Sequence, residues 1–389
     1  MIKKKITACL TCACLTLFLA TPLAAQEEKY VFEGERPVFL DSLLADLTYP
    51  LAWGHSDIRD FDLWRTAARN KLREEMLLPP PPADRYDMKV LATERRKGYT
   101  ARKVSLQLTR YSRVTGYELV PDGKGPFPAV LLLHDHGGHF SIGKEKMIKP
   151  FGVPDSVMAD AKEWCHRCYG DQFVGDYLAS HGYVVFCTDA LFWGDRGMKE
   201  GSRGDYYRYV AGNFMLMGRN ISAWMNFEDV YAAEFMATLP EVDAARLGCM
   251  GFSMGAYRTW MLTALTDKVK YGAAVCWMHT TDYQLSRQLG LTRHEEWANL
   301  LPGMRRWMDY PHIASIACPK PMLFINGSKD KLFPTVAVQK AFDVMHRVWE
   351  SQQAGDRLQT EIWDMPHYCG PEVQQRMLRF LDEATGRKE

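Results

Sequence analysis

The segment at residues 251–255, G-F-S-M-G, restricts the possible folds of this chain more than any other. Residues 246–251 have the apolar composition of a buried strand, and residues 255–265 have the spacing of a helix. A strand that turns sharply into a helix holds the central residue in a strained backbone conformation. Glycines two residues to either side allow the strand and the helix to approach closely. We therefore expect Ser253 to be presented at the carboxyl end of a strand.

Strand-like and helix-like segments alternate over the second half of the chain, which predicts a mostly parallel sheet with helices on both faces. The expected strands cover 128–134, 182–188, 246–251, 271–277, 321–325 and 359–363, and the expected helices cover 227–239, 255–265, 336–349 and 371–381. Segments 88–93, 101–109 and 111–120 have strand character and are expected to form antiparallel strands at one edge of the sheet.

The first 85 residues differ from the rest of the chain. Residues 1–25 combine three lysines, a short apolar run and small residues, the pattern of a secretory signal peptide, and the alternative is an uncleaved anchor. The protein is then expected in a periplasm or outside the cell, without a stable membrane partner after cleavage. Residues 26–85 are predicted to form a helical extension docked on the main domain, with a helix before the prolines at 79–82. Residues 86–389 form the predicted main domain.

A serine hydroxyl needs a base to become nucleophilic, and the base needs an orienting carboxylate. Asp330 follows the apolar strand at 321–325, and His367 follows the strand at 359–363. The order Ser253, Asp330, His367 is the order found when such a serine stands in a strand–turn–helix. Asp364 is a rival acid, but it lies only three residues from His367.

A serine nucleophile also needs N–H donors for the oxyanion of its tetrahedral intermediate. We expect one from the backbone of Met254 and one from the loop at 134–139, H-D-H-G-G-H, where His136 is the first choice and Asp135 the next. Three histidines in this loop could instead hold a metal ion, but a rigid turn at a strand end rarely aims all of them inward. We therefore expect no metal and no cofactor.

The chain from about residue 110 onward resembles the dienelactone-hydrolase-like and acetyl-xylan-esterase-like branch of the α/β-hydrolases. The resemblance is carried by A-V-L-L-L-H-D-H-G-G, G-Y-V-V-F-C-T-D-A-L-F-W-G-D-R-G, G-F-S-M-G, I-N-G-S-K-D and P-H. It implies an α/β-hydrolase fold, a triad of Ser253, Asp330 and His367, and hydrolysis of carboxylic esters, often acetyl groups on plant polysaccharides. Dienelactone hydrolases proper use a cysteine nucleophile, so the serine here favours ordinary ester hydrolysis over lactone opening.

Two long connections, 137–171 and 191–225, follow strands and are expected to be loops that bind substrate. Trp193 could stack on a sugar ring, and Asp195 or Arg196 could bond to its hydroxyls, although these two could equally form a local ion pair. Trp277 is a candidate pocket wall, and apolar packing is its alternative role.

The net charge of +1 and the absence of a basic stripe argue against a nucleic-acid partner. Cys165 and Cys168 form a lone C-x-x-C, for which a local disulfide, pairing with other cysteines, and a metal or redox site all stay open. The expected partner is a small or carbohydrate ester. Two other functions stay open: a peptidase related to prolyl oligopeptidases, against which the short N-terminal extension argues, and a glycan-binding protein that has lost its triad.

Overall fold

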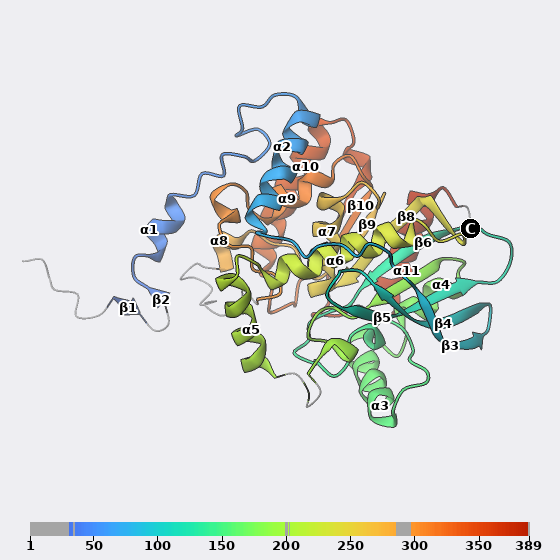
Figure 1. The fold of residues 1–389 in the computed structure, drawn as a ribbon. Helices are drawn as coiled ribbons and strands as arrows, with labels where there is room; N and C mark the ends of the chain where they lie inside the picture. Colours follow the sequence, from blue (N-terminus) through green and yellow to red (C-terminus); the bar gives the residue numbers. More distant parts are fainter. Residues whose placement is uncertain (1–30, 34–35, 199–200, 202, 285–296, 388–389) are drawn as a thin grey trace, which may run out of the picture.

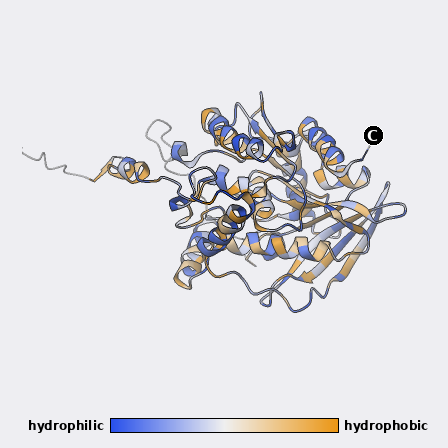
Figure 2. Cartoon of the chain, turned by 90° about the horizontal axis from the view of Figure 1, so that it is seen from above, coloured by the Kyte–Doolittle hydropathy of each residue, from blue (hydrophilic) through white to orange (hydrophobic). Residues whose placement is uncertain are grey.

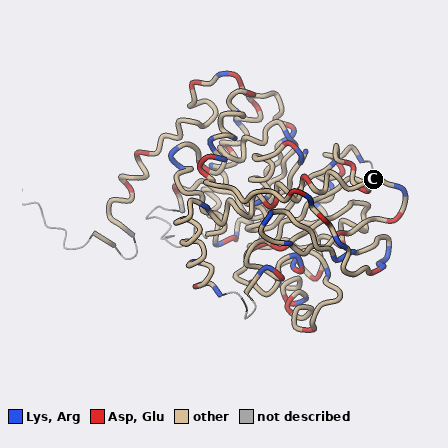
Figure 3. Tube along the Cα trace, viewed as in Figure 1, with Lys and Arg blue, Asp and Glu red and all other residues tan. Residues whose placement is uncertain are grey.

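The computed structural model describes residues 31–33, 36–198, 201, 203–284 and 297–387, built around one large sheet (Figure 1). The predicted signal peptide, residues 1–25, lies outside the described residues. Within the described ranges, no helix combines the length and apolarity needed to cross a bilayer. Lys and Arg are intermixed with Asp and Glu over the whole trace (Figure 3).

Nine strands form the sheet, in the order β11-β10-β9-β8-β6-β7-β5-β4-β3. Their bounds are β3 Lys89–Arg96, β4 Tyr99–Gln107, β5 Arg113–Pro121, β6 Phe127–Leu133, β7 Val184–Thr188, β8 Val242–Phe252, β9 Gly272–Val275, β10 Met322–Gly327 and β11 Leu358–Trp363. The strands from β11 to β7 pair in parallel, and β7, β5, β4 and β3 pair antiparallel. The predicted mostly parallel sheet and its antiparallel edge are both confirmed.

Helices cover both faces of the sheet, as predicted. One face carries α2 (Phe61–Glu75), α6 (Ile221–Met236), α7 (Met254–Leu265) and α10 (Thr335–Ser351), and the other carries α3 (Asp155–Trp164), α4 (Val174–Ser180) and α11 (Pro371–Thr385). The side chains of strand β6 alternate between the two faces of the sheet. Leu131 and Leu133 pack into one apolar cluster, and Val130 and Leu132 pack into the other. Hydrophobic and hydrophilic residues alternate along many of the helices (Figure 2), whereas every residue of α7 is buried.

The N-terminal region contains one docked helix, α2. Its residues Trp64, Ala68 and Leu72 are buried, and Arg69 makes two bonds of 2.9 Å to the carboxylate of Asp267 beyond the end of α7. The short strands β1 (Phe32–Glu33) and β2 (Arg36–Pro37) and helix α1 (Leu40–Ala45) lie apart from the main body, and α1 has no buried residue (Figure 1). The division of the chain at residues 25 and 85 stays a prediction.

The expectation that the two long connections are loops is wrong. The first contains α3, which continues into a π-turn at Cys165–Tyr169, and the second contains α5 (Gly204–Leu216). These helices bury few side chains, Ala161 and Trp164 on α3 and Tyr207 and Ala211 on α5, so their apolar periodicity is weak in the sequence. Two short helices complete this side of the fold, α8 (Thr281–Gln284) and α9 (Tyr310–Ala314).

Candidate active site

Ser253 stands at the junction of β8 and α7 with φ 56° and ψ −125°, a strained backbone conformation for a residue other than glycine. The two flanking glycines are required by close packing. A Cβ on Gly255 would lie 1.8 Å from the carbonyl oxygen of Leu133, and one on Gly251 would lie 2.4 Å from the backbone of Gly255. Strand β6, strand β8 and helix α7 therefore meet with no room for a side chain on either glycine.

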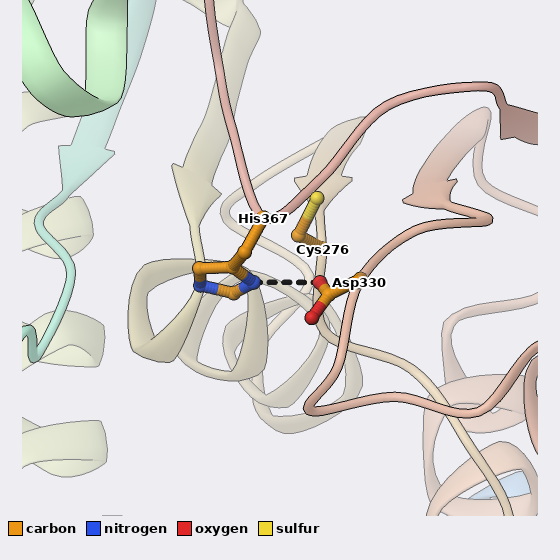
Figure 4. Close-up of side chains that lie close together, drawn as sticks. All are labelled: Cys276, Asp330 and His367. Atoms are coloured by element: carbon orange, nitrogen blue, oxygen red, sulfur yellow. Dashed lines mark hydrogen bonds and ion pairs between the residues drawn. The ribbon is translucent and has the colours of Figure 1, made fainter.

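Asp330 and His367 come from the loops that follow β10 and β11, and they are joined by a hydrogen bond of 2.6 Å between Nδ1 of His367 and Oδ2 of Asp330 (Figure 4). The other carboxylate oxygen of Asp330 accepts from the backbone N–H of Leu332 at 2.9 Å. Since the carboxylate can only accept, Nδ1 of His367 carries the proton, which leaves Nε2 able to act as a base. Gly327 allows the two loops to meet, because its Cβ would lie 2.3 Å from the carbonyl oxygen of Met365.

Asp364, the rival acid, has other partners. Its carboxylate accepts from Lys329 Nζ at 2.9 Å and from the hydroxyl of Ser328 at 3.3 Å, at the surface of the molecule. The hydrogen bond and charge of Lys329 hold the pKa of Asp364 below its usual range. The structure therefore pairs His367 with Asp330 and places Asp364 in a surface ion pair.

The thiol of Cys276 lies beside this pair, at the end of β9 (Figure 4). Ligand-type atoms of Cys276, Asp330 and His367 all lie within 4.8 Å of one another. Burial first, and then the charge of Asp330, raises the pKa of the Cys276 thiol to about 12.

The loop after β6 was predicted to supply an oxyanion donor. Its first residue, His134, is fully buried and uses both ring nitrogens, with Nδ1 2.9 Å from the carbonyl oxygen of Asp135 and Nε2 accepting from the N–H of Ala190 at 3.0 Å. In His136, Nδ1 accepts from the N–H of Gly138 at 2.9 Å. Burial, and then the charge of a nearby lysine, lowers the pKa of His136 to about 4, so both rings are neutral near pH 7.

Ser253, His367 and the loop at 135–138 all line one cavity of about 290 Å³. The N–H of Met254, the other predicted donor, begins α7 and has no acceptor within its own helix. The remaining lining residues are Trp164, Cys168, Phe252, Trp277, His279, Asn299, Leu332 and Phe333. Among the described residues that line the cavity there is neither a lysine nor an arginine, Asp135 is acidic, and four are the aromatic residues Trp164, Phe252, Trp277 and Phe333.

The four predicted substrate-binding residues divide into two groups. Trp277 lines the cavity, whereas Trp193, Asp195 and Arg196 are not among its described lining residues. Trp193 is fully buried, and its Nε1 donates to the carbonyl oxygen of His136 at 3.1 Å. The structure thus places Trp193 beneath the loop after β6.

Asp195 and Arg196 have partners from distant segments. Arg196 makes a bidentate ion pair with Glu228 at 2.5 and 2.8 Å, and Asp195 accepts from Lys144 at 3.1 Å. The alternative of an ion pair between Asp195 and Arg196 does not describe these contacts. Both side chains tie the loop after β7 to other elements of the fold.

Several lining residues have no counterpart in the sequence-based prediction. Phe252 could have been found from its place next to Ser253, and Cys168 belongs to the C-x-x-C motif, whereas Trp164 and Phe333 lie in segments without a motif. The structure pairs none of the seven described cysteines, so Cys165 and Cys168 both carry free thiols.

Comparisons with known proteins show which proteins the chain is similar to. Residues 213–387 match the prolyl oligopeptidase family. The Bacillus subtilis (strain 168) protein named "Putative hydrolase YtaP" is 25% identical over 318 residues, which cover 82% of this chain and 99% of that protein. The chain has the α/β-hydrolase fold.

Solved structures with this fold align with most of the chain. A structure described as "a putative acetyl xylan esterase" from Bacteroides fragilis aligns with a TM-score of 0.67 and 18% identity, over 86% of this chain and 84% of that one. A glucuronoyl esterase from Solibacter usitatus aligns with a TM-score of 0.62 and 15% identity, over 91% and 100% of the two chains. At these identities the similarity concerns the fold of the α/β-hydrolase.

Proposed function

We propose that this protein is an exported serine esterase that cleaves acetyl or related esters on plant-type polysaccharides or oligosaccharides. The observation that carries the proposal is the 2.6 Å hydrogen bond between His367 and Asp330, next to a cavity that His367 shares with Ser253. Ser253 is the nucleophile, His367 the general base and Asp330 the residue that orients the imidazole.

The reaction follows from these roles. Nε2 of His367 takes the hydroxyl proton of Ser253 as Oγ attacks the ester carbonyl. The oxyanion that forms is stabilised by the backbone N–H groups of Met254 and His136. When the intermediate collapses, His367 gives the proton to the departing alcohol and an acyl-enzyme remains. Water, activated by His367, then releases the acid.

The character of the cavity supports a neutral ester substrate. Its described lining has no lysine or arginine that could pair with an anionic group, and a volume of about 290 Å³ suits a small acyl group. Trp277 and Phe333 offer apolar faces on which a sugar ring can pack. The names of the two solved neighbours, an acetyl xylan esterase and a glucuronoyl esterase, agree with esters carried by carbohydrates.

Export rests on the composition of residues 1–25, in which a lysine cluster precedes a short apolar run and small residues. The enzyme would then meet polysaccharide esters in the periplasm or outside the cell.

A peptidase is the second candidate, because the matching family is named for prolyl oligopeptidase. A chromogenic peptide substrate separates the two activities, since cleavage of the peptide without cleavage of acetyl esters would reverse the assignment.

The decisive experiment measures acetate release from acetylated xylan by the chain from residue 26, with the Ser253→Ala variant beside it. Release by the wild type alone supports the proposal. Equal release by both proteins would exclude Ser253 as the nucleophile. If neither releases acetate while the wild type still cleaves p-nitrophenyl acetate, the triad stands and xylan is not the substrate.

A further inference from the structure

A buried lysine, Lys146, lies behind the loop that follows β6. Its side chain is fully inaccessible to solvent. The ammonium nitrogen lies 3.0 Å from the carbonyl oxygen of Asp135, 2.9 Å from the carbonyl oxygen of His136 and 3.4 Å from Oδ1 of Asp135. An ammonium has three N–H donors, and two of them have these carbonyl oxygens as acceptors, whereas the contact with Oδ1 of Asp135 is an ion pair without a hydrogen bond.

These contacts determine which way two peptide groups face. In a trans peptide the C=O and the N–H point in opposite directions. Because the carbonyls of Asp135 and His136 both point to Lys146, the N–H groups of His136 and Gly137 point away from it. Residues 135–138 line the cavity that holds Ser253, so these two N–H groups face the cavity side of the loop.

Three further donors bond to the same carbonyls, among them the backbone N–H of His139, which donates to the carbonyl oxygen of His136 at 3.4 Å. Nδ1 of His134 lies 2.9 Å from the carbonyl oxygen of Asp135, and Nε1 of Trp193 donates to that of His136 at 3.1 Å. Gly137 follows with φ +59°, and successive N–H groups in such a turn form a concave site for an anion. Lys146 is the only one of these donors that binds both carbonyls.

We propose that Lys146 is a positioning residue for the oxyanion site, which holds the N–H groups of His136 and Gly137 toward the developing negative charge. This inference rests on the proposed esterase function. It also adds Gly137 as a donor beside His136. The positive charge of Lys146 polarises both peptide groups through their carbonyl oxygens, which makes their N–H groups stronger donors.

The same turn offers a matched control. Lys144 is also fully buried, two residues away, but its ammonium bonds to Asp189 at 2.7 Å and to Glu145 at 2.7 Å instead of to the loop carbonyls. Replacing either lysine by methionine removes a buried positive charge next to buried carboxylates. Only the Lys146 substitution also releases the carbonyls of the loop.

The experiment compares wild type, Lys146→Met and Lys144→Met with p-nitrophenyl acetate, and measures the binding of phenylboronic acid, which forms a tetrahedral anionic adduct with a nucleophilic serine. Far-UV circular dichroism and melting temperature establish that each variant is folded. We expect kcat of Lys146→Met to fall about 10- to 100-fold, with KM changed less than about threefold and boronate affinity lowered in parallel. Lys144→Met should lose stability and keep its kcat and boronate affinity.

Unchanged kcat and boronate affinity in folded Lys146→Met, or equal losses in both variants, would overturn the inference while the esterase function stands. A wild type that hydrolyses no ester would remove the proposed function and the inference with it. If Lys146→Met does not fold, Trp193→Phe tests the same carbonyl, because it deletes only one donor to His136. A smaller fall in kcat with unchanged KM is then expected, and no change in kcat would overturn the inference.

Discussion

Nδ1 of His367 lies 2.6 Å from Oδ2 of Asp330, although the two residues follow different strands of the sheet. Parallel pairing of β10 and β11 brings both strand ends to the same edge, and Gly327 lets the following loops touch. The arrangement of the sheet therefore brings the two residues together, and their contribution to the reaction can be tested by single substitutions.

Substitution of Asp330 by asparagine should lower kcat by about 10³- to 10⁴-fold, because an amide favours the wrong tautomer of His367. The matched control is Asp364→Asn, which removes a surface carboxylate bonded to Lys329 and should leave kcat within about twofold of wild type. Steady-state kinetics with p-nitrophenyl acetate measure both. A larger fall in kcat for Asp364→Asn than for Asp330→Asn would make Asp364, and not Asp330, the acid that orients His367.

Substitution of Gly255 by alanine should destabilise the protein by about 3 kcal/mol or more, because the new Cβ would lie 1.8 Å from the carbonyl oxygen of Leu133. Gly212→Ala is the control, since Gly212 lies inside helix α5 with open space around its Cα. It should raise stability by about 0.5–1 kcal/mol. Urea unfolding curves measure both changes, and equal effects would contradict the packing described for the turn.

Substitution of Arg258 by methionine should cost about 3–5 kcal/mol of stability, because it leaves the buried carboxylate of Asp229 unpaired. The guanidinium of Arg258 bonds to that carboxylate at 2.6 and 2.8 Å behind the loop after β6. The double variant Arg258→Met/Asp229→Leu should recover at least half of the loss. Urea unfolding of wild type, Arg258→Met, Asp229→Leu and the double variant completes the cycle. Strictly additive losses of stability would argue against the pairing of Arg258 with Asp229.

Stability should fall with pH between about 6.5 and 4, in part through His312. Burial lowers the pKa of His312 from 6.5 to about 4, so between these values the unfolded chain binds the proton more readily than the folded chain. Stability is then fully present above pH 6.5 and is lost as pH falls toward 4. Nδ1 of His312 also accepts the N–H of Asp309 at the start of α9, a bond that protonation would break.

The variant His312→Gln isolates this contribution, because glutamine can accept the same N–H and does not titrate. Between pH 6.5 and 4 its free energy of unfolding should fall by about 1–3 kcal/mol less than that of wild type. Denaturant unfolding at several pH values measures the difference. If the free energy of unfolding falls equally with pH in the two proteins, His312 does not contribute to the pH dependence of stability.

Cys276 should resist alkylation in the folded protein. Its thiol is buried, and its pKa is raised to about 12, so little thiolate is present at pH 8. Iodoacetamide followed by mass spectrometry should label Cys276 only after unfolding in urea. Rapid labelling of the native protein would contradict the burial of this thiol beside Asp330.

The parallel sheet and the positions of Ser253, Asp330 and His367 could be predicted from sequence because the central strands are continuous apolar runs. Such runs leave little doubt about strand identity, and parallel pairing brings their carboxyl ends to one edge. The approach of His367 to Asp330 was expected from chain order, but the distance between them depends on Gly327 and on loops whose course the sequence does not reveal.

The contacts of Trp193, Asp195 and Arg196 could not be predicted. Their partners Lys144, His136 and Glu228 lie in segments far away in the sequence. A single sequence does not indicate which distant side chains come into contact. Lys146 was missed for the same reason. In the sequence it is one of several lysines in a polar stretch, and only the folded chain shows it buried against two carbonyls.

The site is assembled from the ends of β8, β10 and β11, which are far apart along the chain. During translation the ribosome completes the turn of Ser253 long before it adds Asp330 and then His367. Under the proposed function, a nascent chain carries its nucleophile without a base and is inert toward esters. The order of synthesis thus delays activity until β10 and β11 have joined the sheet.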